Sequence, residues 1–198
     1  KKSVPAWDKA TLASCWNGGA GQRMMNIVSP LMSDQKADAY IGWMKSRGVT
    51  AAHVILANAK DGENAGYCIY GPNFDWTIDA AFVGVMKSRI AKLRKAGLSV
   101  VVWLITDDSA AYAKALKANP GKYLADLKAQ GLLAQASTVV LALEANEYLS
   151  ANDVNALARA TRANYKGKIG SHQTSGRCDF SVFADIVFYQ VDPGKPAA

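Results

Sequence analysis

The chain has 198 residues, half of them hydrophobic, and a net charge of +7 from 23 basic and 16 acidic residues. This length allows one well-buried core and is short for two, so we expect residues 1–198 to form a single domain. No apolar run approaches the roughly 20 residues that span a bilayer, which predicts a soluble protein without a membrane span. Nucleic-acid binding is disfavoured, because no basic stripe with interleaved aromatic residues and no known motif is present.

The chain opens on two lysines and a serine, without an initiator methionine or a signal peptide. We therefore expect a processed form or a domain of a longer protein or assembly. The three cysteines, Cys15, Cys68 and Cys178, are widely separated and lack CxxC spacing, so no metal site is predicted. The glycine-rich segment 17–21 precedes a predicted strand instead of following one, and neither a dinucleotide fingerprint nor a P-loop occurs. No cofactor is predicted.

The predicted elements alternate between strand and helix. Short apolar, β-branched runs predict strands, and apolar residues at helical spacing between a polar cap and a glycine predict helices. The predictions in chain order are a strand at 23–29, a helix at 33–47 closed by Gly48, a strand at 51–58, a helix from a cap at Asp75 or Thr77 to Lys95, a strand at 98–106, two helical pieces broken at 119–121, a strand at 138–144, a helix at 150–165 with a capping box, a strand at 168–173, a helical turn at 180–184 and a strand at 186–191.

This regular alternation implies right-handed βαβ units and a parallel sheet. The predicted fold class is α/β, a TIM-barrel-like (β/α) arrangement with about six βα units visible, where a complete barrel usually takes about 250 residues. Within these elements, His53 and Trp103 are expected to pack in the core, and Trp43 and Met44 are expected to face the sheet.

Polar side chains follow the apolar strands at the end where such barrels carry their chemistry. Loop residues Tyr67 and Tyr70 are expected to add aromatic surface at the same end. Acids, amides and aromatic rings together suit a carbohydrate, because hydroxyls bind the polar groups and sugar faces stack on rings. A polar residue at any one strand end could merely start the following loop. This explanation accounts less well for polar residues at all of the strand ends. The candidate carbohydrate-binding residues are Trp76, Asp107, Asn146, His172, Gln173, Tyr189, Gln190 and Asp192.

The segment 143–148, which reads Leu-Glu-Ala-Asn-Glu-Tyr, follows the fourth predicted strand. It resembles the Asn-Glu motif of clan A glycoside hydrolases, which are (β/α)8 barrels with their general acid/base Glu at the fourth strand. The resemblance implies that Glu147 protonates the glycosidic oxygen and that Asn146 binds a sugar hydroxyl beside the reacting carbon. The family carries its nucleophilic Glu on the seventh strand. With six units visible, the barrel here is expected to be reduced, incomplete or completed by another segment.

Glycoside hydrolysis needs a second carboxylate beside the acid. Glu144 is the favoured partner of Glu147, with Asp107 and Asp192 at neighbouring strand ends as reserves. On a regular strand the two glutamates would point to opposite faces, so they can share a site only if the chain bends after Glu144. The predicted function is a glycoside hydrolase-like domain that cleaves a poly- or oligosaccharide. The alternative is a non-catalytic carbohydrate-binding or structural module of a larger cell-surface or virion-associated assembly.

Overall fold

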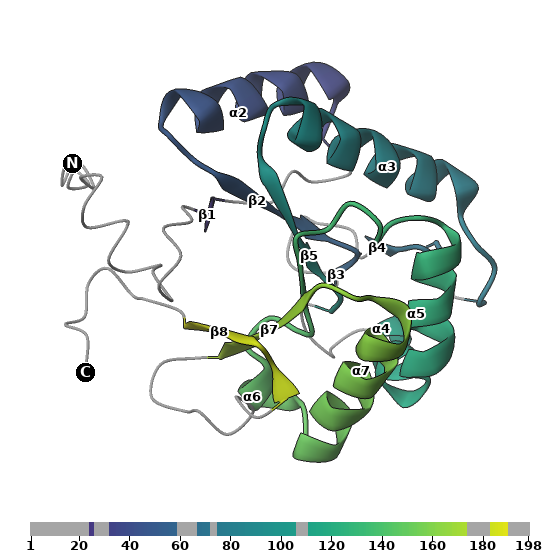
Figure 1. Ribbon diagram of the computed structural model, residues 1–198. Helices are drawn as coiled ribbons and strands as arrows, with labels where there is room; N and C mark the ends of the chain where they lie inside the picture. The colour runs from purple at the N-terminus through teal and green to yellow at the C-terminus, as the bar shows by residue number, and fades with distance from the viewer. Residues whose placement is uncertain are drawn as a thin grey trace, which may run out of the picture.

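The structure is a computed structural model that describes residues 24–25, 32–58, 67–71, 75–105, 111–173 and 183–189. No helix in these ranges combines the length and the apolar character needed to cross a membrane. The elements, drawn in Figure 1, are β1 Met24–Met25, α2 Asp34–Ser46, β2 Ala51–Ile55, β3 Ala57–Asn58, β4 Tyr67–Cys68, α3 Ala80–Lys95, β5 Ser99–Trp103, α4 Ala111–Ala118, α5 Pro120–Ala129, β6 Thr138–Val140, α6 Ala145–Tyr148, α7 Ala151–Asn164, β7 Lys168–Gln173 and β8 Ile186–Tyr189.

Six of the described strands form one sheet in the order β1-β2-β5-β6-β7-β8, and every neighbouring pair in it is parallel. Each strand therefore pairs only with the strands before and after it in the βα series. Figure 1 shows α2 and α3 over one part of this curved sheet and α4, α5 and α7 over the other. A doubly wound sheet would reverse its strand order and carry helices on both faces. The fold is thus the predicted α/β class, an open (β/α) barrel-like sheet over the described residues.

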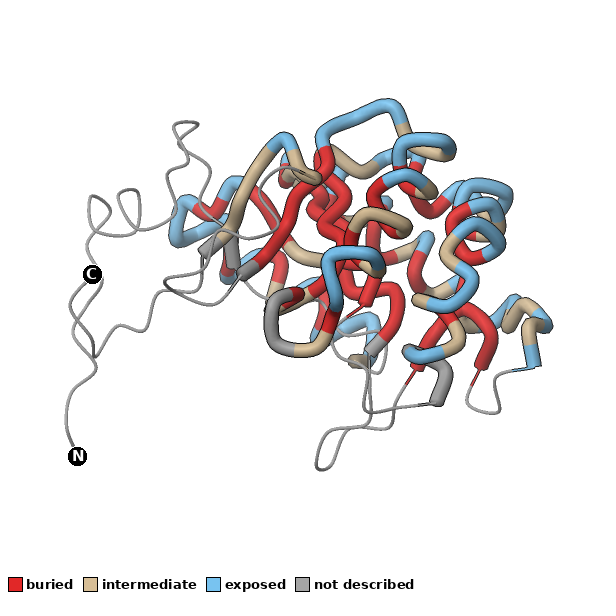
Figure 2. The backbone as a smooth tube through the Cα atoms, turned by 90° about the horizontal axis from the view of Figure 1, so that it is seen from below, coloured by how far each residue is buried: buried red, intermediate tan, exposed pale blue. Residues whose placement is uncertain are grey.

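The sheet has two faces of different character. One row of residues, each from a different strand, faces the helices and is fully buried in the main hydrophobic core. It consists of Val54, Val102, Val139 and Ile169. The tube in Figure 2 shows this burial along the strands, with the exposed residues on the outer sides of the helices. We call the opposite face, which is turned away from the helices, the inner face. A second and smaller buried cluster lies there, formed by Ala51, Ile55, Tyr67, Val101, Trp103 and Val140.

A single row of paired residues crosses the inner face from β2 to β8. It consists of Ile55, Trp103, Val140, Gly170 and Ile186. The glycine in this row makes room for the ring of Phe188, because a Cβ at Gly170 would lie 2.6 Å from Phe188 Cε2 and 3.1 Å from Val140 Cγ2. The packing of β8 on β7 therefore depends on the absence of a side chain at position 170.

Local signals set most helix ends where they were predicted. Arg47 and Gly48 (φ 70°) close α2. Ser150 and Asp153 form the predicted capping box at the start of α7, in which each side chain accepts a hydrogen bond from the other residue's backbone N–H. The predicted cap of α3 was wrong. Asp79 caps this helix by accepting from the N–H of Phe82 (2.9 Å), while Asp75 accepts from the N–H of Thr77 in the turn before it.

Three strands are shorter than predicted over the described residues. The run predicted at 98–106 is a strand only from Ser99 to Trp103. The run predicted at 51–58 is interrupted at Leu56, and the residues beyond it form β3, which pairs antiparallel with β4. The run predicted at 138–144 is a strand only to Val140. On a regular strand, amides two residues apart face the same neighbour. Here the N–H of Leu141 donates to Gly170 O on β7 (3.0 Å), whereas that of Leu143 donates to Ile105 O beyond β5 (2.9 Å). The chain has left the strand geometry before it reaches Glu144.

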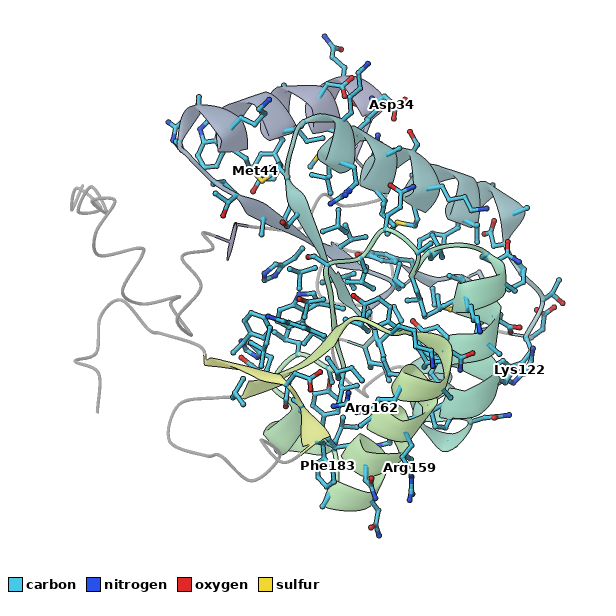
Figure 3. All side chains as sticks on the ribbon, in the orientation of Figure 1. Asp34, Met44, Lys122, Arg159, Arg162 and Phe183 are labelled. Atoms are coloured by element: carbon cyan, nitrogen blue, oxygen red, sulfur yellow. The ribbon has the colours of Figure 1, made fainter. Side chains whose placement is uncertain are left out.

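Trp43 does not face the sheet, contrary to the prediction. Its side chain is 37% exposed, its ring stacks on Tyr40 (5.6 Å between centroids), and the guanidinium of Arg47 lies 4.2 Å from the ring centroid. The buried side of α2 is formed by Ala37, Ile41 and Met44. Met44, which is fully buried, lies between α2 and the sheet as predicted (Figure 3). One position along a helix turns a side chain by 100°, so the two neighbours cannot share a face.

Replacing Gly170 by Ala should destabilise the protein. The added methyl group would overlap the Phe188 ring, and forced overpacking of this kind typically costs about 1–3 kcal/mol. Gly84→Ala is the matched control, because a Cβ at this exposed position in α3 meets no atom within 4 Å and should stabilise the helix by roughly 0.5–1 kcal/mol. Urea unfolding of both variants measures the two effects. A Gly170→Ala variant as stable as the parent would contradict this account of the β7–β8 packing.

Candidate functional site

The loop after β6 lies at the carboxyl edge of the sheet, between the ends of β5 and β7. Its backbone bonds reach both sides, to Gly170 O on β7 and to Ile105 O beyond β5. Parallel strands bring their carboxyl ends to one edge, and in (β/α) barrels that edge carries the active site. The loop therefore occupies the position at which the sequence predicted the chemistry.

Glu144 forms the sharp turn that ends this loop. Its backbone is left-handed, with φ 48° and ψ 44°, and α6 starts at the next residue. A left-handed backbone costs a non-glycine residue roughly 1–2 kcal/mol, so such residues persist only where their surroundings hold them. The backbone N–H of Glu144 donates a hydrogen bond to Nδ1 of His172 (2.9 Å). A side chain of β7 thus holds the turn at which the chain leaves β6.

A bend at Glu144 is what a shared site for the two glutamates requires. The chain bends at Glu144, and Glu147 follows three residues later on the single helical turn of α6. The side chains of Glu147 and Asn146 lie outside the described part of the structure, so the catalytic assignment stays a prediction.

His172 belongs to a row of three rings on the inner face, from β2 across β5 to β7. Its ring centroid lies 5.0 Å from that of Trp103, which in turn lies 4.8 Å from that of His53. Trp103 is 3% exposed and His172 is 5% exposed. Core packing of Trp103 was predicted, but its contact with the two histidines was not. We call His53, Trp103 and His172 the ring row.

Both histidines of the ring row are held neutral. Burial lowers the pKa of His172 to about 4. Burial, followed by the charge of His172, lowers the pKa of His53 to about 4. A neutral imidazole that accepts a hydrogen bond at Nδ1 carries its proton on Nε2. The Nε2 atom of His172 is therefore a donor, which suits a hydroxyl, ether or carbonyl oxygen. With Nδ1 occupied, His172 cannot act as a general base.

Trp103 adds a second donor to the same face. Its indole Nε1 is buried and has no hydrogen-bond partner among the described residues. Buried polar groups are nearly always hydrogen-bonded, and an unsatisfied one costs about 1–3 kcal/mol. An indole N–H without an acceptor beside a buried neutral histidine is unusual for a purely hydrophobic cluster.

Trp76, another candidate for sugar binding, packs at the helix layer. Its ring lies edge-on to Tyr70 (4.9 Å), and Lys122 Nζ of α5 lies 5.3 Å from its centroid. The expectation that Tyr67 and Tyr70 offer open aromatic surface was wrong, since they are 9% and 3% exposed. Burial has a cause in each case, because Tyr67 packs with Phe82 (5.6 Å) and the Tyr70 hydroxyl donates to an oxygen of Asp126 (2.6 Å).

The remaining candidates lie outside the described residues in whole or in part. The backbones of Gln173 and Tyr189 are paired at the ends of β7 and β8, but their side chains are not described. Asp107, Gln190 and Asp192 lie outside the described residues altogether. The roles of these five residues stay predictions. Within the described ranges, no group of three or more His, Cys, Asp or Glu side chains is arranged to hold a metal ion.

The fold is similar to that of several glycoside hydrolases of known structure. A GH113 β-1,4-mannanase matches with a TM-score of 0.57 and 11% identity over 82% of this chain and 60% of its own. A glycoside hydrolase family 5 protein from Bacteroides vulgatus matches with a TM-score of 0.55 and 13% identity over 76% of this chain and 35% of its own. A family 1 β-glucosidase from Thermotoga maritima matches with a TM-score of 0.50 and 17% identity over 73% of this chain and 38% of its own.

These matches concern the fold. Identities of 11–17% show a shared architecture, and the chain spans at most 60% of the length of these three proteins. No protein-family model matches the chain, and no curated protein sequence matches it. The similarity therefore supports the (β/α) barrel-like architecture directly, whereas the residues at its carboxyl edge must carry any argument about activity.

The two neutral histidines of the ring row should make stability fall in mild acid. An unfolded histidine takes up a proton near pH 6.5, whereas His53 and His172 in the folded protein do so near pH 4. The unfolded state therefore binds more protons between these values. The stability that the two neutral imidazoles contribute is fully present above pH 6.5 and is lost as pH falls toward 4. A pKa difference of one corresponds to about 1.4 kcal/mol, so the expected loss is a few kcal/mol.

Urea unfolding at a series of pH values from 7.5 to 4.5 measures this loss, and the paired substitution His53→Gln with His172→Asn is the control. The free energy of unfolding of this control should change less between pH 6.5 and pH 5 than that of the parent. Few carboxylates titrate in this range. A parent protein whose free energy of unfolding stays constant down to pH 5 would show that these two imidazoles are not kept neutral by the fold.

Proposed function

We propose that the chain is a carbohydrate-active domain that hydrolyses glycosidic bonds of a poly- or oligosaccharide by carboxylate acid/base catalysis. In this proposal Glu147 is the general acid/base and Glu144 is its partner. The observation that carries the proposal is the left-handed turn at Glu144, which starts α6 at the carboxyl edge of a singly wound parallel sheet.

The fold comparisons support this class of reaction. Several of the similar structures are glycoside hydrolases, among them a β-1,4-mannanase and a β-glucosidase. Because barrels of this kind host many unrelated chemistries, the fold raises the expectation of glycoside hydrolysis without deciding it. The acids and the Asn-Glu sequence after β6 supply the argument that is specific to this chain.

Glycoside hydrolysis makes definite demands on two carboxyl groups. They lie about 5–5.5 Å apart when one attacks the sugar, and about 6.5–9.5 Å apart when a water molecule does. Glu144 is the left-handed residue just before α6 and Glu147 is the third residue of α6, so the two proposed acids lie on the same short loop. Asp107 and Asp192 are the reserve partners, since they follow β5 and β8.

The ring row would support substrate binding beside these acids. Oxygen atoms of a sugar are acceptors that suit the Nε2 donor of His172. This donor lies on β7, the strand next to the loop of Glu144. Asn146, Gln173, Tyr189 and Gln190 are the further residues proposed to contact the carbohydrate. The proposal thus combines acids on the β6–α6 loop with hydrogen-bond donors on the neighbouring strand.

Replacing Glu147 by Gln should remove most turnover and leave the fold intact. The amide keeps the shape of the acid but cannot donate a proton, and positioned acid catalysis contributes about 10²–10⁴-fold. Release of reducing ends from a panel of polysaccharides measures hydrolysis, and the melting temperature reports on folding. Asp38→Asn is the control, because Asp38 is an exposed acid on α2 that pairs with Lys92 (2.7 Å) and has no place in the site.

The outcomes separate the two functions considered for the chain. Hydrolysis by the parent and by Asp38→Asn, with none by Glu147→Gln at an unchanged melting temperature, supports the proposal. Binding of a polysaccharide by the parent without release of reducing ends identifies a non-catalytic carbohydrate-binding module instead. A Glu147→Gln variant that melts lower yet keeps full activity per folded molecule would make Glu147 a structural residue.

A further inference from the structure

We propose that His172 is a positioning residue, which fixes the left-handed turn at Glu144 and thereby the orientation of α6, the helical turn that carries Asn146 and Glu147. This inference rests on the proposed function for its catalytic consequence. Its structural part, that one imidazole nitrogen holds the turn, stands on the contacts described below.

The backbone of the β6–α6 loop changes partners at Glu144. The amides of Leu141 and Leu143 donate to backbone carbonyls, those of Gly170 and Ile105. The next amide, that of Glu144, donates to a side-chain nitrogen instead. Glu144 makes no side-chain cap hydrogen bond at the start of α6. The bond to His172 is therefore a long-range interaction that anchors the residue with the costly left-handed backbone.

His172 is itself held on a rigid part of the molecule. It lies within β7, where it is paired with Phe188 of β8, and its side chain is 5% exposed. Its ring packs against Trp103, and Trp103 packs against His53, so the imidazole has neighbours on the inner face from two other strands. Sites supported by strands and packed rings hold their geometry more closely than sites on loops. The acceptor at Nδ1 is thus presented in one orientation.

The bond requires a neutral imidazole. Protonation at Nδ1 would turn the acceptor into a second donor facing the amide of Glu144. Burial keeps the pKa of His172 at about 4, so the acceptor is available near neutral pH. His53 is the nearby titratable group of the ring row, and it is neutral over the same range. Glu144 takes part in this contact through its backbone N–H and not through its carboxylate.

Loss of the hydrogen bond between Glu144 and His172 should slow catalysis by displacing the residues of α6. Without it, Glu144 can relax toward an ordinary backbone conformation, and the residues of α6 that follow would rotate with it. A displacement of about 1 Å at a reacting group can cost on the order of 10²-fold in rate. His172 would then affect turnover without supplying or removing a proton.

Two substitutions at position 172 separate this role from packing. Asparagine places its Oδ1 close to the position of Nδ1 and can accept the Glu144 hydrogen bond, but it is polar and leaves space. Leucine fills more of the cavity and suits burial, but it offers no acceptor. A packing role predicts that His172→Leu keeps more activity and stability than His172→Asn. Both variants lack the Nε2 donor of His172, so loss of that contact affects them alike. A positioning role predicts the reverse order for kcat, with His172→Leu about 10–10²-fold below His172→Asn.

A spectroscopic measurement on the unliganded protein tests the hydrogen bond independently of any substrate. Long-range ¹H–¹⁵N correlation should show His172 with Nδ1 unprotonated and Nε2 protonated at pH 7. The Glu144 amide should be protected from hydrogen exchange in the parent and in His172→Asn, and unprotected in His172→Leu. A proton on Nδ1, or equal protection in both variants, would overturn the inference.

Failure of the proposed function is distinguishable from failure of this inference. If the parent releases no reducing ends from any polysaccharide, the catalytic role of His172 falls with the proposed function, and the Glu144 amide still shows whether His172 holds the turn. If the parent is active and His172→Leu retains full kcat, the positioning role is refuted while the proposed function stands.

Discussion

Parallel pairing between consecutive strands is the constraint from which the rest of this structure follows. Each connection has to return the chain to the amino end of the sheet, and right-handed crossovers put the connecting helices on one face. The helices bury alternate strand residues such as Val54, Val102 and Val139 in the main hydrophobic core. The same pairing brings every strand's carboxyl end to one edge. The position of the β6–α6 loop is thus a result of topology before any side chain is considered.

The inner face is built differently from the helix-facing core. Two neutral imidazoles and an indole N–H without a described acceptor lie where aliphatic side chains would pack at lower cost. A left-handed non-glycine residue, Glu144, lies at the same edge and is tied to one of these imidazoles. Strained backbone and buried polar groups that occur together commonly mark functional sites. This combination, more than the overall fold, directs attention to the edge.

The fold comparisons and the site contribute separate arguments. Similarity to mannanase and glucosidase structures concerns the path of the backbone, at sequence identities too low to carry residue roles. The residue-level argument comes from this chain, through the turn at Glu144, the Asn-Glu sequence that follows it and the donors on β7. Trp76 and Tyr70 illustrate the difference, because they lie beside the expected edge in sequence but pack with Lys122 and Asp126 at the helix layer.

The sequence by itself determined the strand–helix alternation and many element ends. Gly48 closing α2, the capping box of α7 and the break at Asn119 before α5 are local signals between near neighbours in the chain. Tertiary structure alone decided that Trp43 is exposed and that the strand of Glu144 ends at Val140. It also decided the contact between Glu144 and His172, which are 28 residues apart. Register and long-range packing select such contacts, and neither is written in the local spacing of residues.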